Sequence, residues 1–303
     1  MRTSLAASLC LLVAALPACK MNRFIANQMT ASLQDQTIAF ERETNVRHAR
    51  EAGPGMLKML DGFLVSSPDN PDLLLAGMRM NTVFGFALIE EEDPQRARDL
   101  YARARAYGER LLSRRKGFLE ALRKGGPELD AALQGLRRED VPLLFWYAFA
   151  WGSWVNVQRT SPDAVADLPT VQALMGRLRE LDETYYQAGP HLFLGVTYGS
   201  RTKTMGGDPD KAREHFEANL RLTSRRFLLS HVYYARFHAV QTQDRNLFLK
   251  LLEEVRDAAA DLDPDQALAN AIARDRAARL LKKVDDLFLP ELPEEGTEEP
   301  AKE

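Results

Sequence analysis

The sequence has few of the residues that build cross-linked or metal-binding sites. It contains 303 residues but only two cysteines, Cys10 and Cys19. Cys10 lies within an apolar N-terminal segment and Cys19 directly follows it, which leaves no pair for a disulfide, a Cys-x-x-Cys motif or a thiolate metal site. The five histidines form neither a His-Glu-x-x-His motif nor a cluster with metal-ligand spacing. We therefore predict no metal site and no cofactor.

Signatures of catalysis and nucleotide binding are absent as well. The sequence contains no Gly-x-Ser-x-Gly, Gly-x-x-x-x-Gly-Lys-Ser/Thr or Gly-x-Gly-x-x-Gly motif. Acidic pairs such as Glu253–Glu254 fall on polar helix faces and are typical of solvated charge. Lys and Arg are spread along a chain of net charge −3, so no basic stripe indicates a nucleic-acid partner. We expect no enzyme, no catalytic residues and no nucleic acid among the partners.

No run of alternating Val, Ile and Thr bounded by turn residues occurs, so we expect no strand. Nearly every segment beyond the N-terminus has helical periodicity, and a hydrophobic content of 45% is enough for a sizeable core. The sequence therefore predicts an all-α protein. The expected helices cover residues 38–49, 56–65, 72–89, 94–124, 128–136, 141–157, 168–181, 190–201, 227–241, 244–259 and 264–288, with a break at residues 53–55 and a kink at Gly108 or Gly117.

The N-terminus predicts export and lipidation. Arg2 precedes an apolar run over residues 5–16, which is too short for a bilayer span of about 20 residues. The run leads into Leu-Pro-Ala-Cys at residues 16–19, the pattern of a signal peptide cut before a cysteine that becomes acylated. The alternative is an ordinary signal peptide cut elsewhere. Two or three acyl chains on Cys19 give stable anchoring, and Lys20 after it favours the outer over the inner membrane.

The chain accordingly divides into four parts. Residues 1–18 are a lipoprotein signal peptide, and residues 19–50 form a lipid-anchored segment that leads into the domain. Residues 51–289 form the helical domain. The tail over residues 290–303 is rich in Glu and Pro and is too polar to fold.

A sequence repeat marks the helical region. Residues 93–101, Asp-Pro-Gln-Arg-Ala-Arg-Asp-Leu-Tyr, reappear as residues 208–216, Asp-Pro-Asp-Lys-Ala-Arg-Glu-His-Phe, and a weaker copy covers residues 227–259. Asp is a natural N-cap, Pro suits the first helical position, and Ala shares a face with the aromatic four residues later. A helix is expected before each copy, which makes the tetratricopeptide pattern. We expect tetratricopeptide-like helical hairpins in an irregular superhelix.

Residues 141–157 contain all three tryptophans and no charged residue. A helix that is apolar on every side lies in a core, so we expect the superhelix to surround this buried aromatic helix. Tyr147, Trp151 and Trp154 form one stripe on it. That stripe either packs in the core or lines an apolar cavity that Asn156 and Arg159 close.

The segment over residues 189–201 is the second candidate. Gly195 and Gly199 are four residues apart, so a helix or a ligand can approach the backbone there. The segment is either an ordinary helix of a pair or the place where Tyr198 and Arg201 stand at a pocket mouth, with Arg201 pairing an anionic group. The candidate ligand-binding residues are thus Tyr147, Trp151, Trp154, Asn156, Tyr198 and Arg201.

Together these residues resemble a known family, the T component of tripartite ATP-independent periplasmic (TRAP) transporters. The matching text is Leu-Phe-Trp-Tyr-Ala-Phe-Ala-Trp-Gly-Ser-Trp at 144–154, Asp-Leu-Pro at 167–169, residues 189–201, Gly-Gly-Asp-Pro at 206–209 with 212–216, and Gln-Thr-Gln-Asp-Arg at 241–245. The resemblance implies a lipid-anchored protein of tetratricopeptide-like pairs, a homotrimer with a pore or cavity in each protomer, and association with the periplasmic solute-binding subunit. The family has no established catalytic residues, so none is assigned.

The leading hypothesis is a non-enzymatic lipoprotein on the periplasmic side of the envelope. It binds or relays a small apolar or amphipathic organic acid between the envelope and a TRAP solute-binding subunit. The alternative is a scaffold lipoprotein that recruits envelope-assembly partners. A passage beside the tryptophan-bearing helix favours transport, and a sealed core under Trp151 and Tyr198 favours the scaffold. An envelope hydrolase, the third hypothesis, requires a carboxylate pair in a cleft.

Overall fold

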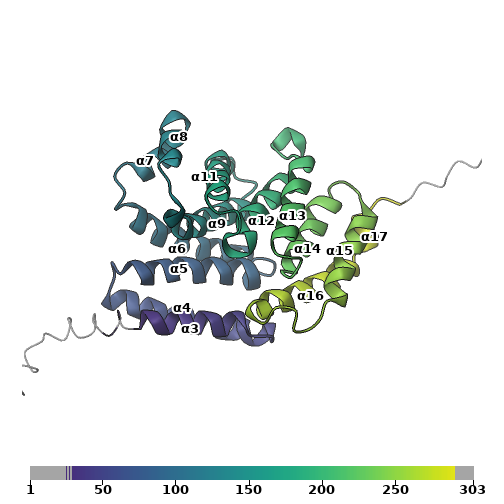
Figure 1. Ribbon diagram of the computed structural model, residues 1–303, viewed down its shortest axis with the longest axis horizontal. Coiled ribbons are helices and arrows are strands. Elements are labelled where there is room, and N and C mark those ends of the chain that lie inside the picture. Colours follow the sequence, from purple (N-terminus) through teal and green to yellow (C-terminus); the bar gives the residue numbers. More distant parts are fainter. Residues whose placement is uncertain (1–24, 26, 28, 291–303) are drawn as a thin grey trace, which may run out of the picture.

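The computed structural model describes residues 25, 27 and 29–290, and every regular element among them is helical. The prediction of an all-α protein is confirmed for this part of the chain. The predicted signal peptide, Cys19 and residues 291–303 of the predicted tail lie outside the described residues. Figure 1 shows α7 and α8 at one end of the molecule and α15 and α17 at the other, with α9 and α12 between them, while α3 runs along the lower edge and meets α16.

Three helices open the described chain: α3 (Thr30–Glu41), α4 (Val46–Ser66) and α5 (Pro71–Phe84). The predicted helix over residues 38–49 and the predicted break at residues 53–55 are both wrong. The chain leaves the helix after Glu41, and α4 begins where the side chain of Asn45 accepts a hydrogen bond from the N–H of His48. From there α4 continues through Pro54.

Packing explains why Pro54 does not end α4. The helix buries one stripe of side chains against its neighbours: Ala49, Gly53, Leu57, Leu60 and Leu64. A Cβ atom on Gly53 would lie 2.1 Å from the Phe84 ring, so only glycine lets α5 approach this closely. Proline in a helix interior costs about 3 kcal/mol, and the burial of this stripe offsets that cost because a single fully buried Leu contributes about 2 kcal/mol.

The two Asp-Pro copies begin two helices, α6 (Pro94–Leu112) and α13 (Pro209–Leu222), as predicted. Asp93 accepts from the N–H of Arg96 at 3.0 Å, and Asp208 accepts from the N–H of Lys211 at 3.1 Å. The alanine and the aromatic residue that the two copies share are fully buried in both. They are Ala97 and Tyr101 in the first copy and Ala212 and Phe216 in the second. Local capping and burial therefore follow the repeat residue by residue.

Each copy follows another helix. A π-helix, η1 (Gly85–Ile89), extends α5 and precedes α6, and α12 (Tyr185–Gly199) precedes α13. The weaker third copy consists of α14 (Leu229–Tyr234), a second π-helix η4 (Ala235–Ala239) and α15 (Arg245–Asp257). The helix predicted over residues 94–124 is two helices, because Gly117 with a φ of +77° separates α6 from α7 (Phe118–Lys124).

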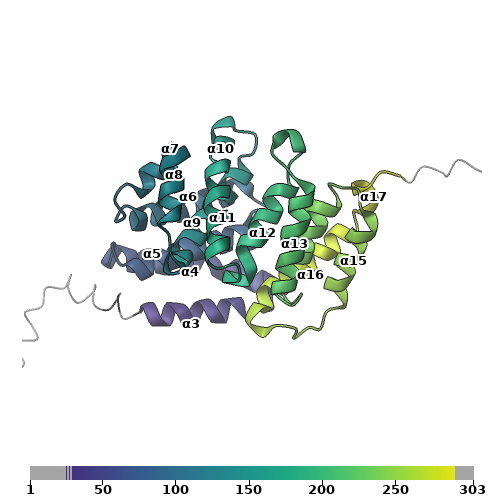
Figure 2. The same ribbon diagram turned by 45° about the horizontal axis from the view of Figure 1, so that its top comes forward.

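The remaining elements connect these helices: α8 (Gly126–Gln134), η2 (Arg138–Asp140), α9 (Val141–Val157), α10 (Pro162–Ala166), α11 (Leu168–Leu181), η3 (Lys203–Met205), η5 (Pro264–Gln266), α16 (Ala267–Leu281) and α17 (Val284–Leu287). The turned view in Figure 2 shows α9 behind α11, with α12 and α13 side by side. The pairing of α12 with α13 is close because a Cβ atom on Gly195 would lie 3.1 Å from the Phe216 ring.

The helix α9 has the predicted bounds and is buried, with packing against α5, α6, α11 and α12. Its buried side chains include Leu144, Phe145, Trp146 and Tyr147 on successive positions, so every face of the helix is covered. Among the described residues, only the span Pro71–Ile89 is long and apolar enough to cross a membrane by length and composition. More than half of its apolar window is buried in the fold, as in a core helix.

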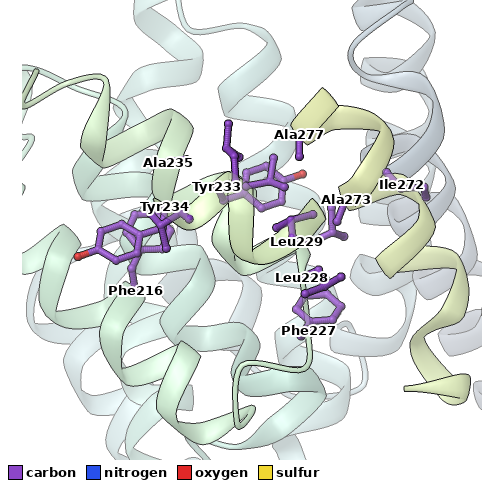
Figure 3. Packing of buried hydrophobic residues seen from close by; sticks show 14 of the residues in the cluster. Phe216, Phe227, Leu228, Leu229, Tyr233, Tyr234, Ala235, Ile272, Ala273 and Ala277 are labelled. Atoms are coloured by element: carbon purple, nitrogen blue, oxygen red, sulfur yellow. The ribbon is translucent and has the colours of Figure 1, made fainter. Parts of the chain in front are cut away.

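Apart from the core around α9, a cluster of buried hydrophobic residues joins the C-terminal helices α14, α15 and α16 to α13. Figure 3 shows Tyr234 of α14 against Phe216 of α13, while Tyr233 points toward Ala277 of α16. The Phe216 and Tyr234 rings stack with centroids 4.9 Å apart. A Cβ atom on Gly199 would lie 2.5 Å from the carbonyl oxygen of Phe237, so glycine allows α12 to touch the η4 backbone. The predicted small-residue stripe at Gly195 and Gly199 therefore serves helix packing.

Candidate ligand-binding site

An apolar cavity of about 120 Å³ lies beside α9. This is close to the size of engineered apolar cavities that take a benzene ring, about 150 Å³. Elements far apart in the sequence surround it: the end of α3, η1, α9, α12 and α16. The side chains on its wall from α9 and α12 are Phe145, Phe149, Ser153, Asn156, Leu192, Phe193, Val196, Thr197 and Ser200, and Arg201 adjoins them. Gly152 lets the Phe193 ring approach α9, since a Cβ atom there would lie 2.2 Å from that ring, and Ser153 is small where flanking positions of α9 carry large rings.

Among the residues that the structure describes, Arg201 is the one cation on the cavity wall. Its Nη1 donates to the carbonyl oxygen of Thr197 at 3.1 Å. Burial lowers the pKa of Arg201, and within the part of the chain that the structure describes no carboxylate lies within ion-pair distance of it. A partly buried guanidinium without a carboxylate can bind an anionic group through several N–H donors.

Asn156 lines the same cavity and is held by a buried carboxyl group. Its Nδ2 donates to Glu90 Oε1 at 3.2 Å, and the Tyr101 hydroxyl donates to the other carboxyl oxygen of Glu90. Burial raises the pKa of Glu90. Asn156 and Arg201 are thus the two predicted site residues that the structure brings to one cavity.

The other four predicted residues do not line this cavity. Tyr147, Trp151 and Trp154 lie on another face of α9, where the Arg105 guanidinium lies 5.0 Å from the Trp151 ring centroid and 4.8 Å from that of Trp154. Trp151 Nε1 also donates to Asp167 Oδ2 at 2.7 Å. Tyr198 stacks on His215 with ring centroids 5.8 Å apart.

Sequence reasoning missed the phenylalanines of the cavity wall. Phe145, Phe149, Ser153 and Asn156 recur three or four residues apart on α9, with Gly152 beside them, and that spacing indicates one face. The combination of large rings with small neighbours was the available signal, because a small residue between large ones leaves space. The stripe of Tyr147, Trp151 and Trp154, predicted from its own helical spacing, lies on another face of α9.

A left-handed turn precedes the regular part of α12 and supplies Tyr186 to the cavity wall. Tyr186, Gln187 and Ala188 have φ values of 43°, 57° and 51°. Three such non-glycine residues in a row are strained, at about 1–2 kcal/mol each. Asn219 of α13 holds the turn, since its Nδ2 donates to the carbonyl oxygens of Gln187 at 2.8 Å and Ala188 at 2.9 Å.

Two buried histidines join α12 to α13 near this turn. His191 Nδ1 lies 3.0 Å from His215 Nδ1, and His191 Nε2 lies 3.1 Å from a Glu183 carboxyl oxygen. Both contacts are satisfied when His215 donates to His191 and His191 donates to Glu183. Burial lowers the pKa of His215 to about 4, helped by the neighbouring His191, and burial also lowers the pKa of His191.

The histidine pair predicts a loss of stability in mild acid. Below a pH of about 6.5 the unfolded chain protonates His215 while the folded chain does not, so stability falls from about pH 6.5 toward pH 4. The full effect of this one group is about 3 kcal/mol. Urea unfolding at pH 7.5, 6.0 and 5.0 measures it, and His215→Gln should flatten the decline. The exposed His48→Gln is the control; an equally steep decline in His215→Gln would contradict the prediction.

Among the described residues, no group of three or more His, Cys, Asp or Glu side chains is arranged to hold a metal ion. The site therefore consists of an apolar wall, the amides of Asn156 and Gln266, small hydroxyls, the Arg201 guanidinium and, from α3, the Glu41 carboxylate. Such an arrangement binds an amphipathic molecule by burial and orients it by its charged end.

Comparison with known proteins adds one finding. The sequence profile of the TRAP transporter T-component family matches residues 42–288, which is most of the chain and includes every wall of the cavity except the one that α3 supplies through Phe40 and Glu41. No curated protein matches the chain.

Proposed function

The chain belongs to the TRAP transporter T-component family, and on that premise we propose that it binds a small amphipathic organic acid and relays it to a TRAP solute-binding subunit. The family is one of transporter components, which implies a non-enzymatic role, association with other TRAP components and a place in the cell envelope. The predicted resemblance is thus confirmed. The ligand, the specific partner and the direction of relay are the proposal.

The observation that carries the proposal is the pairing of an apolar cavity with Arg201. Phe145, Phe149 and Phe193 line a cavity of about 120 Å³, a size that suits a short alkyl chain or an aromatic ring. Burying apolar area contributes about 25 cal/mol per Å², and Arg201 selects a carboxylate over a neutral end group. Asn156, fixed by Glu90, supplies a second polar contact.

The finer architecture supports a docking role in the same protein. We assign α5 with η1 and α6, α12 with α13, and α14 with η4 and α15 as tetratricopeptide-like hairpins of an irregular superhelix. Such surfaces bind partners along a concave side. A homotrimer, which the family resemblance implies, would place three cavities in one assembly.

Attachment to the membrane completes the proposal. Acylation of Cys19 would hold the protein on the periplasmic face of a membrane, the outer one by the Lys20 criterion. Mass spectrometry of the protein purified from membranes would detect a diacylated or triacylated N-terminal cysteine.

Ligand binding is tested with octanoate and 1-octanol, which share a chain and differ in charge. We expect Arg201→Gln to weaken octanoate binding about tenfold or more and to leave 1-octanol binding nearly unchanged, because a charge-assisted hydrogen bond contributes about 1.5–3 kcal/mol. Isothermal titration calorimetry measures both. Arg213→Gln, at an exposed position of α13, is the matched control. If Arg201→Gln weakens the binding of both ligands equally, or leaves octanoate affinity unchanged, Arg201 does not bind the carboxylate.

A scaffold is the second candidate, and one observation favours it. Trp151 and Tyr198 are packed against Arg105, Asp167 and His215 instead of facing an open passage. The cavity lies on the other side of α9, so the two observations point to different functions. Capture of a TRAP solute-binding subunit from envelope extract, strengthened by octanoate, would favour the relay. Capture that octanoate and Ala269→Phe in the cavity wall leave unchanged would favour the scaffold.

A further inference from the structure

Glu41 of α3 lies where three spaces meet, and Arg79 of α5 borders two of them. A surface groove of about 350 Å³ runs between α3 and α5 and reaches Trp146 and Tyr185 at its inner end. A smaller space under α3 adjoins it, and the cavity beside α9 lies beyond. Glu41 lines all three spaces, and Arg79 lines the first two. The side-chain pair of Arg79 and Glu41 therefore stands between the groove and the cavity.

The guanidinium of Arg79 is held in place but only partly satisfied. It lies 5.5 Å from the centre of the Trp146 ring and 5.4 Å from that of Tyr186. Its Nη2 donates to Glu41 Oε1. Its Nε is buried and finds no hydrogen-bond partner among the described residues. Glu41 thus uses one edge position of a guanidinium that can offer two parallel N–H donors to a carboxylate.

Glu41 comes from a helix that covers the site loosely. The main contacts of α3 are with α5, α16 and η5. Leu33 is its buried anchor, whereas Ile38 is 44% exposed and the only ion pair from the end of α3 to η5, Arg42 with Asp265, is solvated on both sides among the described residues. Empty space lies on two sides of α3. The other apolar contact of α3 is the half-buried Phe40, which packs against the core and lines the cavity. A helix held by so few apolar contacts among its described side chains can open at a lower cost than the core helices.

We propose that Arg79 is a carboxylate-binding site at the entrance to the cavity, that Glu41 occupies it while the cavity is closed, and that α3 is the lid. An incoming acid bonds to Nε and Nη2 together, displaces Glu41 and passes its apolar chain toward Phe149 and Phe193. Arg201 receives the acid on the far wall. The inference rests on the proposed function, because it assumes that the cavity takes an amphipathic acid.

The test uses octanoate and calorimetry in an Arg201→Gln background, where the inner site is disabled. Glu41→Gln should tighten the remaining octanoate binding about three- to tenfold, because it removes an internal competitor. Arg79→Gln should abolish that binding, and Arg79→Lys should weaken it, because lysine cannot form the bidentate contact. Asp35→Asn, at an exposed carboxylate of the same helix, is the matched control and should change nothing.

Lid movement gives an independent readout in the otherwise unchanged protein. Octanoate should speed amide hydrogen exchange over residues 30–41, and 1-octanol should not, since only the acid displaces Glu41. Unchanged exchange, or equal affinities of the Glu41→Gln and Asp35→Asn variants, would overturn the lid and the Arg79 site. If neither octanoate nor 1-octanol binds the unmodified protein, the proposed function itself fails. If Arg201→Gln weakens binding while the Arg79 and Glu41 variants have no effect, only this inference fails.

Discussion

Replacing Asn219 by alanine is expected to lower the free energy of unfolding by about 3–5 kcal/mol, because each buried polar group left unpaired costs about 1–3 kcal/mol. Asn219 is fully buried and holds three groups. Its Nδ2 donates to the carbonyl oxygens of Gln187 and Ala188, and its Oδ1 accepts from the Ser230 hydroxyl. The first two belong to the strained left-handed turn, which no other described hydrogen bond ties to α13.

Urea unfolding of Asn219→Ala at pH 7.5 measures this loss. Asn246→Ala, at an exposed position of α15, is the control and should stay within about 0.5 kcal/mol of the unmodified protein. Octanoate affinity should fall as well, because release of the turn frees Tyr186 from the cavity wall. If the free energy of unfolding falls by less than about 1 kcal/mol, the left-handed turn is stable without Asn219, contrary to the role given to that residue.

Replacing Arg276 by alanine is expected to cost about 3–5 kcal/mol, because it removes several hydrogen bonds from buried groups and each buried group left unpaired costs about 1–3 kcal/mol. Arg276 of α16 is only 5% exposed. Its Nη1 donates to the Tyr233 hydroxyl at 2.6 Å, and its Nη2 donates to the carbonyl oxygens of Phe86 and Ala87 at 3.2 Å each. Its Nε lies 3.0 Å from Glu91 Oε1. The substitution would remove the hydrogen bonds of Arg276 to the Phe86 and Ala87 carbonyl oxygens of η1 and to the Tyr233 hydroxyl.

Arg279→Ala is the matched control for Arg276→Ala. Arg279 lies on the same helix and pairs with the same Glu91 carboxylate at 2.9 Å, but its side chain is about half exposed. An exposed pair contributes about 0–1 kcal/mol, so its loss should be small. Thermal unfolding of the two variants side by side gives the comparison. Equal melting temperatures would show that burial of Arg276 adds nothing beyond an ordinary surface pair.

Local chemistry decides which parts of this fold could be predicted from the sequence. The starts of α6 and α13 were predictable because Asp93 and Asp208 cap their own helices within one turn. The bounds of α9 followed from its uniform apolar character. The path of α4 through Pro54 was not predictable, because it depends on Phe84, a residue of another helix, packing over Gly53.

The candidate site was only half predictable for the same reason. Asn156 and Arg201 stood out as polar residues at the ends of apolar segments, and both reach the cavity. Which face of α9 lines that cavity depends on where α12 and α16 lie, and no local pattern encodes this. The turn at Tyr186 and the contact of Glu41 with Arg79 also depend on partners distant in the chain.

The two π-helices carry a consequence for how this protein can diversify. In η1 the N–H of Glu90 bonds to the carbonyl oxygen of Gly85, and in η4 the N–H of Val240 bonds to that of Ala235, so each wide turn holds one residue more than an α-helix needs. Loss of a single codon within η1 would restore ordinary helical spacing and rotate Phe86 and Ala87, both on the cavity wall, by about 100° relative to the helix that follows. A one-residue insertion or deletion in a π-helix could thus reshape the cavity wall without a change in the sequence of the other helices around it.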